Sequence, residues 1–265
     1  MDVTPIIALA LALGCILGGN AMEGGHLSAL IQPTAAMIVL GGTLAATWLS
    51  ATPAEVKKLF KLSKRVIFPG LALRALIVED LLKVSGVVRR DGMLAVEPLL
   101  AELRDPTLRR GLQLLVDGNA AEDVQALLEL EADMEEHHSK SAAKILDSAG
   151  GFAPTVGILG AVMGLIHVMS NLNDPTKLGS GIAVAFVATL YGVGFANLVF
   201  LPIGARIRKI VEAEAEDRAM VLAGLVAVVA GANGRQISER LGPYTGHGDG
   251  KAEPGAGGGG AKEAA

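Results

Sequence analysis

The sequence has almost no cysteine, few aromatic residues and no strong excess of either charge. Its single cysteine, Cys15, excludes an internal disulfide and any metal site built from several cysteines. Aromatic residues make up only 3% of the 265 residues, although 51% of the chain is hydrophobic and its mean hydropathy is +0.47. A formal net charge of -4 offers no basic excess for nucleic acid, and DNA- or RNA-binding motifs are absent. Such an apolar but aromatic-poor composition is typical of helices in lipid.

Charged residues are missing from four intervals, each long enough to cross a bilayer as a helix. The intervals cover residues 3–22, 27–54, 148–173 and 178–205. About 20 apolar residues, rising 1.5 Å each, cross roughly 30 Å of hydrocarbon. The first interval lacks the basic start of a secretion signal, so we expect it to remain in the chain as a span.

Short connections pair these intervals into two transmembrane hairpins. The first hairpin occupies residues 1–54, with spans at about 4–22 and 28–51. The second occupies residues 148–205, with spans at about 150–172 and 178–203. The sequence therefore predicts an all-α membrane protein with four transmembrane helices and a helical domain between the second and third.

The remaining segments carry most of the charge and are predicted to lie outside the bilayer. Residues 55–147 read as a helical domain, 206–241 as a C-terminal helix and 242–265 as a disordered tail rich in glycine and alanine. Apolar spacing continues from Ala120 into the third span, which predicts one long helix, and likewise from Ile203 to about Val229. The apolar stretch 219–230 is too short to span, so we expect it to pack against the extramembrane helices.

Lysine and arginine set the expected orientation of the spans. The two short hairpin tips hold one cation, Lys177, whereas both segments that follow the hairpins are basic. Those basic residues are Lys57, Lys58, Lys61, Lys64 and Arg65, then Arg206, Arg208 and Lys209. By the positive-inside rule, the long central segment and both termini are predicted to be cytoplasmic.

The four intervals contain no Asp, Glu, Lys or Arg that could carry a proton through the membrane. His167 lies about one turn from the predicted tip of the second hairpin and is best interpreted as an interfacial residue. If the chain conducts ions, the titrating carboxylate must come from a helix of a partner protein.

Small and weakly polar residues line the second hairpin instead. The glycines predicted to pack the helices closely are Gly157, Gly160, Gly164 and Gly192. Thr155 and Thr189 are typical of hydroxyls that bond back to their own helix. A second interpretation is that these residues and Ala161 form a wall along which a partner's carboxylate moves.

Two prolines interrupt the predicted spans near their ends. Pro154 and Pro202 lack an N–H group, which leaves the carbonyl groups near Gly150 and Leu198 in need of other partners. The two prolines therefore predict either fixed kinks or hinges.

Four segments, taken in order, resemble the MotA/PomA flagellar stator subunits of the MotA/TolQ/ExbB channel family. They are EGGHLSALIQPTAAMIVLGGTLAAT (23–47), RRDGMLAVE (89–97), GGFAPTVGILGAVMGLI (150–166) and AVAFVATLYGVGFANLVFLPI (183–203). The likeness covers about residues 1–241. It implies a multi-pass protein of the bacterial inner membrane, five copies of which surround two MotB-like subunits. Each MotB-like subunit would supply an aspartate on one span and bind peptidoglycan, while this chain pushes on the rotor protein FliG.

The resemblance also implies roles for individual residues. Rotor-facing charges of the family match Arg89, Arg90 and Glu97; without the resemblance, the two arginines would instead be interpreted as complementing a helix C-terminus. The two functional prolines match Pro154 and Pro202. Sodium-driven relatives carry a threonine where this chain has Ala161 and keep the one at Thr189, so the chain is expected to use protons.

Other classes of function find less support in the residues. The chain shows no catalytic triad and no phosphate-binding loop, so we expect no enzyme activity and no cofactor. The adjacent His137 and His138 do not have metal-ligand spacing, and no metal site is predicted. Two alternatives remain open: a TolQ/ExbB-like energiser of another trans-envelope machine, and a membrane scaffold that conducts no ions.

Overall fold

A computed structural model describes residues 2–68, 74–171 and 175–245, without the side chains of 175–177. The described residues form helices and no strand. Four helical stretches are long and apolar enough to cross a membrane: Thr4–Met22, Leu27–Leu49, Ala121–Ser170 and Leu178–Val229. The predicted all-α fold with four spanning helices is confirmed.

The chain divides into two compact units. Unit 1 comprises Met1–Leu71 and Leu130–Ala215, and unit 2 comprises Ala72–Glu129 and Glu216–Ala265. Two of the borders, 129/130 and 215/216, fall inside the long helices α7 (Ala121–Ser170) and α9 (Leu201–Val229). The two units follow from contacts between residues and not from the position of a bilayer, so the membrane boundaries expected from the sequence stay predictions.

The first hairpin of unit 1 begins with α1 (Thr4–Met22), which has no buried residue. A short 3-10 turn, η1 (Leu27–Leu30), leads to a single helical stretch made of α2 (Pro33–Ala36), the π-helical turn η2 (Met37–Gly41) and α3 (Gly42–Leu49). Gln32 is extended, as the residue before a proline must usually be, so the new helix starts at Pro33.

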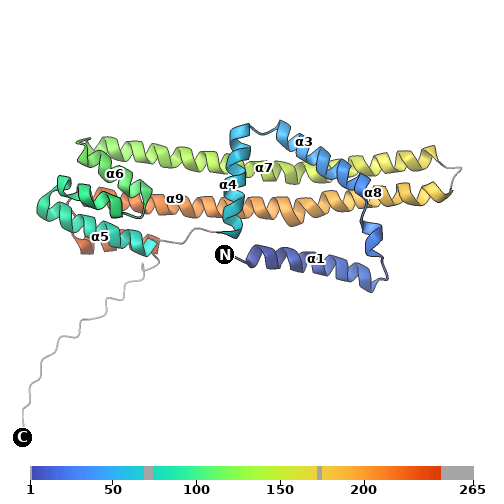
Figure 1. Cartoon of the computed structure of the whole chain (residues 1–265), viewed down its shortest axis with the longest axis horizontal. Coiled ribbons are helices and arrows are strands. Elements are labelled where there is room, and N and C mark those ends of the chain that lie inside the picture. Colours follow the sequence, from blue (N-terminus) through green and yellow to red (C-terminus); the bar gives the residue numbers. More distant parts are fainter. Residues whose placement is uncertain (1, 69–73, 172–174, 246–265) are drawn as a thin grey trace, which may run out of the picture. The chain divides into compact units, whose positions relative to one another are not determined.

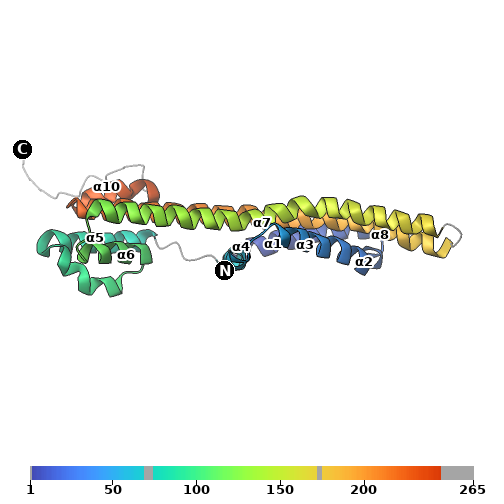
Figure 2. The ribbon, with the colours of Figure 1, turned by 90° about the horizontal axis from the view of Figure 1, so that it is seen from above.

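The second hairpin of unit 1 is formed by α7 and by a continuous helix made of α8 (Pro175–Phe195), η4 (Ala196–Phe200) and α9. Within this unit the two long helices run side by side in opposite directions (Figures 1 and 2). A small buried cluster of Ala35, Val39, Val187 and Ala188 joins α2 and η2 to α8.

A separate helix, α4 (Pro53–Ile67), follows the first hairpin and runs across α7 and α9 rather than along them (Figures 1 and 2). A reciprocal capping box between Thr52 and Glu55 starts it. Leu62 and Val66 on one face are buried against α7 and α9, where they meet Ala142 and Ile207.

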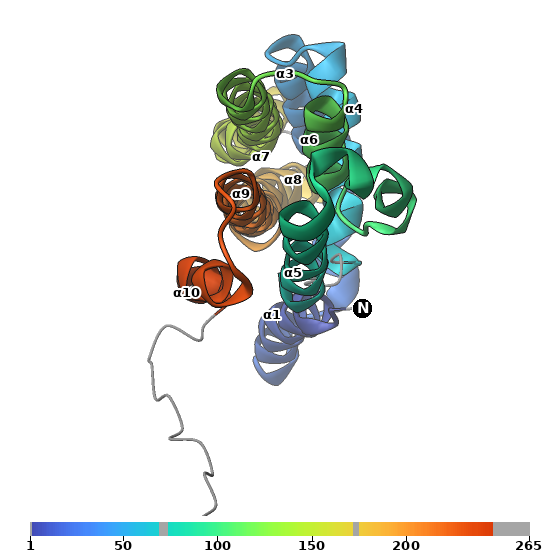
Figure 3. The ribbon, with the colours of Figure 1, turned by 90° about the vertical axis from the view of Figure 1, so that its left-hand side faces the viewer.

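Unit 2 packs six helical segments around one apolar core. They are α5 (Arg74–Asp91), the 3-10 segment η3 (Met93–Glu102), α6 (Pro106–Val116), the adjoining ends of α7 and α9, and α10 (Gly234–Thr245). In Figure 3, α5 and α10 lie on the same side of α9, and Ser85 of α5 donates a hydrogen bond to the Ala232 carbonyl just before α10. Met220, Val221 and Leu225 of α9 are buried in this core, which confirms the packing predicted for 219–230.

The long helices extend as the periodicity predicts, but the C-terminal segment differs from the prediction. Residues 206–241 were expected to form one helix, whereas α9 ends at Val229 and α10 begins at Gly234. Gly231, with φ of 72°, accepts the left-handed conformation that ends α9, and the N–H groups of Gly231 and Ala232 bond back to Val228 and Ala227. Of the tail predicted to be disordered, 242–245 belong to α10 and 246–265 lie outside the described residues.

Candidate functional site

The four predicted packing glycines lie in one seam between α7 and α8. A Cβ atom added to Gly192 would stand 2.5 Å from the Ala153 carbonyl oxygen and 3.0 Å from the Cα of Gly157. The two helices touch backbone to backbone here, and a side chain on either glycine would push them apart.

The same seam continues toward the tip of the hairpin. A Cβ atom on Gly164 would lie 2.8 Å from both the Ala185 nitrogen and the Gly181 carbonyl oxygen. A Cβ atom on Gly160 would lie 2.8 Å from the methyl group of Ala188. Close approach rather than backbone conformation therefore requires glycine at positions 160, 164 and 192, and a Cβ atom on Gly157 would lie 3.0 Å from the Ala188 carbonyl oxygen.

The first hairpin covers one flank of this seam. Val156 of α7 lies against Gly42, where an added Cβ would stand 2.8 Å from the Val156 Cγ1 atom. On α8, the Tyr191 hydroxyl donates to the Leu30 carbonyl over 2.6 Å and accepts from the Gln32 N–H over 3.3 Å. These contacts hold η1 and the start of α2 against α8.

Ala161 and Thr189 lie together on the opposite flank. Gly160 and Ala188 meet in the seam, and each is followed by the next residue about 100° farther round its helix. Because the helices are antiparallel, both steps turn to the same side, away from Val156 and the first hairpin. Ala161 of α7 and Thr189 of α8 therefore lie at the same height along the hairpin and on the same face of the helix pair.

Thr155 does not join this pair. It lies six residues before Ala161, which places it about 120° away around α7, and it is exposed. Its hydroxyl donates to the Phe152 carbonyl over 2.8 Å, and that of Thr189 donates to the Ala185 carbonyl over 3.3 Å. Both threonines thus bond back to their own helix, while their oxygen lone pairs can still accept a hydrogen bond.

Both prolines lie within continuous helices. Pro154 is inside α7 and half-buried, next to the Gly192 contact. Pro202 is the second residue of α9, two residues after the end of η4, where the helix widens to a π-helical turn. Proline has no N–H group to donate to the preceding turn, and a π-helical turn adjusts the backbone where that hydrogen bond is missing. The helix therefore continues through Pro202. The proline signalled an interruption, but nothing in the sequence specified its π-helical form.

Charge returns immediately beyond the uncharged part of the hairpin. Arg208 of α9 and Asp147 of α7 form an ion pair over 2.5 Å, and Gly204 leaves room for the carboxylate. Arg206 pairs with Asp2, which precedes α1. The basic residues after each hairpin predict the orientation of the spans, whereas the ion-pair partners Asp147 and Asp2 are seen only in the structure.

The three residues matched to rotor-facing charges are exposed in unit 2. Arg89 and Arg90 occupy the last turn of α5, and Glu97 lies in η3 beyond the turn at Gly92, whose φ is 86°. The Arg90 guanidinium donates to the Gly86 carbonyl over 3.2 Å, as expected for a cation near a helix C-terminus. Arg89 and Glu97 extend from neighbouring segments of the same unit.

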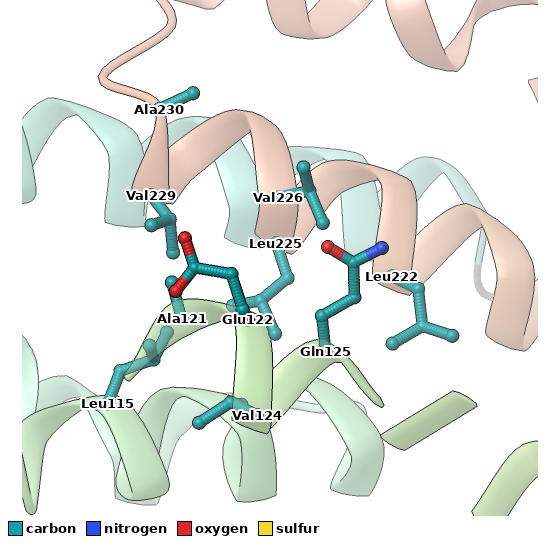
Figure 4. Close-up of a pocket in the computed structure, with 10 residues that line it drawn as sticks. All are labelled: Leu115, Ala121, Glu122, Val124, Gln125, Leu222, Leu225, Val226, Val229 and Ala230. Atoms are coloured by element: carbon teal, nitrogen blue, oxygen red, sulfur yellow. The ribbon is translucent and has the colours of Figure 1, made fainter. Parts of the chain in front are cut away.

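A cavity of about 190 Å³ opens in unit 2 between the end of α6, the start of α7 and the end of α9 (Figure 4). Its lining is mainly aliphatic, with the polar side chains of Glu122 and Gln125 on α7. None of the predicted site residues lines it. Among the described residues, no group of three or more His, Cys, Asp or Glu side chains is arranged to hold a metal ion.

Comparison with known proteins identifies the arrangement. Residues 100–220 match the MotA/TolQ/ExbB proton channel family, and residues 6–86 match the motility protein A N-terminal family. Motility protein A of Bacillus subtilis is 32% identical over 245 residues, which cover 91% of this chain and 90% of the relative. This chain belongs to the motility protein A family.

Solved structures agree with this family assignment. The structure of C. jejuni MotAB superimposes with a TM-score of 0.86 at 27% identity, covering 96% of this chain and 98% of that one. The flagellar MotAB stator complex from Bacillus subtilis gives a TM-score of 0.82 at 30% identity, covering 91% and 95%. The chain therefore has the fold of motility protein A, and the α7–α8 face with Ala161 and Thr189 is part of that fold. It is an inner-membrane protein with four apolar spans.

Proposed function

We propose that this chain is the membrane subunit of a flagellar stator, in which copies of it surround a MotB-like partner and conduct protons that drive rotation. The observation that carries the proposal is the uncharged face shared by Ala161 and Thr189 within a motility protein A fold. The similar structures are complexes with MotB, which supports a partner at this face.

The partner supplies the group that the spans lack. A proton crosses hydrocarbon only on a titratable group or along water, and the charge-free intervals hold no Asp, Glu, Lys or Arg, with His167 near the hairpin tip. A carboxylate on a partner helix that passes the α7–α8 face completes the path. Small residues at this face let that helix approach closely.

Several copies of the chain complete the wall. The α1 helix has no buried residue, and the large apolar side chains of α7, including Ile158, Leu159 and Met163, are exposed in the single chain. Five copies in a ring, as the family resemblance implies, would cover part of this surface with other subunits and leave the rest to lipid.

Rotation requires that ion flow change the shape of the hairpin. Pro154 lies in the α7–α8 seam, and Pro202 follows the π-turn η4, so both positions lack a regular hydrogen bond where the helices bend most easily. One charge moving through 100 mV releases only about 2.3 kcal/mol, so torque arises from many small steps. We assign the push on FliG to unit 2 through Arg89, Arg90 and Glu97.

Proton leak through the assembled complex tests the proposal directly. The chain is co-expressed with its MotB-like partner after removal of the segment that plugs the channel, and cytoplasmic acidification is measured. We expect a leak when this unplugged partner keeps its membrane aspartate and none when that aspartate is changed to asparagine. An intact complex that does not leak would favour the non-conducting scaffold.

The choice of ion is a separate prediction. Ala161 removes one hydroxyl per subunit from the face where a partly dehydrated sodium ion would need several oxygen ligands, whereas a proton needs only the carboxylate. Swimming speed at fixed pH and fixed proton-motive force should therefore be unchanged when sodium is replaced by potassium. A loss of speed that follows sodium concentration would contradict proton drive.

The orientation of the first span separates this proposal from a TolQ/ExbB-like energiser. With four spans and the basic segments inside, both termini lie in the cytoplasm. A reporter that works only in the cytoplasm should be active when it is fused before residue 1, and one that works only in the periplasm should be inactive there. Periplasmic activity would favour the energiser, whose usual topology has an outside N-terminus.

A further inference from the structure

The helix α4 combines a packed face and an outward face of very different chemistry. Leu62 and Val66 are buried against α7 and α9. The exposed residues recur at the spacing of one helical stripe: Pro53, Ala54, Lys57, Phe60, Lys61, Lys64 and, just past the helix end, Phe68. We call Lys57, Phe60, Lys61, Lys64 and Phe68 the basic-aromatic stripe.

The cations of α4 divide into two groups by their partners. Lys58 pairs with Glu135 of α7 over 2.7 Å, and Arg65 pairs with Glu214 of α9. In the part of the chain that the structure describes, Lys57, Lys61 and Lys64 form no ion pair with a carboxylate. The cations that face the protein are neutralised, whereas those of the stripe remain a concentrated positive charge.

Large apolar side chains accompany this charge. Phe60 is 69% exposed among the three lysines, and Phe68 is 57% exposed. Trp48, at the end of the preceding spanning helix α3, is 72% exposed. Exposed aromatic rings beside lysines are unfavourable in water but match the boundary between acyl chains and headgroups, where lysine stems reach outward to the charged layer.

The course of α4 gives this stripe a long contact with such a boundary. It begins four residues after the end of α3 and runs across α7 and α9 (Figures 1 and 2). A helix that crosses the direction of the spans at this point would lie along the membrane surface. Its stripe lies opposite the face packed on those helices and is turned to the surroundings of unit 1.

We propose that the basic-aromatic stripe binds the anionic phospholipids of the leaflet into which α3 emerges. The phosphate groups neutralise Lys57, Lys61 and Lys64, and the ring of Phe60 enters the acyl-chain boundary between them. The cytoplasmic leaflet is the anionic one, so the inference rests on the proposed orientation for its location in the cell, although not for the chemistry of binding.

The preference of the protein for an anionic over a zwitterionic phospholipid reports this binding, and it can be measured independently of ion flow and rotation. The full chain, purified with its MotB-like partner, is placed in phosphatidylcholine nanodiscs with a trace of spin-labelled phosphatidylglycerol or spin-labelled phosphatidylcholine. The ratio of the two association constants is obtained from the motionally restricted signal. We expect the combined variant Lys57→Gln, Lys61→Gln, Lys64→Gln to lower this ratio by more than about fivefold, since one lysine at the surface adds on the order of fivefold and three are removed.

A matched pair of single variants separates the stripe from simple loss of charge. Lys61→Gln lies on the stripe and should lower the ratio, whereas Lys58→Gln lies on the same helix but faces Glu135 and should leave it within error. Binding of spin-labelled phosphatidylcholine should be equal in all variants, which shows that each is folded in its lipid. Concentrated salt should remove the preference of the unmodified chain.

Two results would overturn the inference: a triple variant that keeps the full preference, or equal losses in Lys58→Gln and Lys61→Gln. The proposed stator function is judged separately by the proton leak. A complex that prefers phosphatidylglycerol through the stripe but never leaks would contradict the channel and retain the lipid site.

Discussion

At the scale of single residues, glycine has two distinct uses in this chain. Gly92 and Gly231 adopt positive φ where helices end, whereas Gly157, Gly160, Gly164 and Gly192 are helical and allow two backbones to touch. The chain has 34 glycines, so composition alone could not separate these roles. Only the neighbouring atoms show which glycines are required.

This distinction predicts opposite effects for two alanine substitutions on α8. Gly192→Ala places a methyl group 2.5 Å from the Ala153 carbonyl oxygen and should destabilise the hairpin by about 1–3 kcal/mol. Gly194→Ala meets no atom within 4 Å and should be neutral or stabilising by up to about 1 kcal/mol, because alanine favours helix. Thermal unfolding of the purified chain in detergent compares the two, and equal destabilisation would argue against the seam.

At the scale of elements, α4 is tied to α7 by a network centred on one carboxylate. Glu55 accepts hydrogen bonds from the Thr52 N–H over 2.9 Å and from the Ser141 hydroxyl over 2.5 Å. These bonds to the charged form, above all that from Ser141, lower the pKa of Glu55 from 4.5 to about 2. One side chain therefore caps α4 and connects it to the neighbouring helix.

Because the pKa of Glu55 is lowered, the stability that its carboxylate adds to the fold depends on pH. A carboxylate with a lowered pKa adds stability that is complete above about pH 4.5 and disappears as the pH falls toward 2. Glu55→Gln should therefore melt at a lower temperature than the unmodified chain at neutral pH, and the difference should shrink between pH 4.5 and 2. The exposed Glu23→Gln should show no such difference, and a gap for Glu55→Gln that is constant with pH would contradict the assignment.

Removing the other half of the capping box gives a related expectation. Thr52→Ala loses the hydroxyl that accepts from the Glu55 N–H over 3.3 Å and should cost about 1 kcal/mol of stability. Thr52→Asn keeps an acceptor and should restore most of it. The same thermal unfolding experiment measures both, and an alanine variant as stable as the asparagine variant would show that the cap contributes little.

At the scale of the whole molecule, α7 and α9 are the helices that belong to both compact units. The units have separate buried clusters, and α9 contributes Ile207 and Val211 to a cluster of unit 1 and Met220 and Leu225 to the core of unit 2. Changes in the hairpin therefore have a covalent and helical route to the unit that carries the predicted rotor-facing charges.

Charge reversal in unit 2 tests whether its exposed charges act on the rotor while the hairpin conducts protons. Arg89→Glu, Arg90→Glu and Glu97→Lys change exposed side chains, so membrane insertion, complex formation and proton leak should be retained while swimming is strongly impaired. Arg235→Glu, on the exposed surface of α10 in the same unit, is the control and should swim normally. Failure of the three variants to insert would instead indicate a structural role for these residues.

The sequence by itself determined the four spans, because a charge in hydrocarbon is so costly that its absence over about 20 residues is visible without any structure. The 3.6-residue period likewise predicted that α7 and α9 continue beyond the spans. The tertiary structure decided which side of each helix meets which neighbour. It paired Ala161 with Thr189, separated Thr155 from them and divided the cations of α4 into paired and unpaired sets. A helical period gives angles around one axis only, and the contact between two axes depends on side chains far apart in the chain.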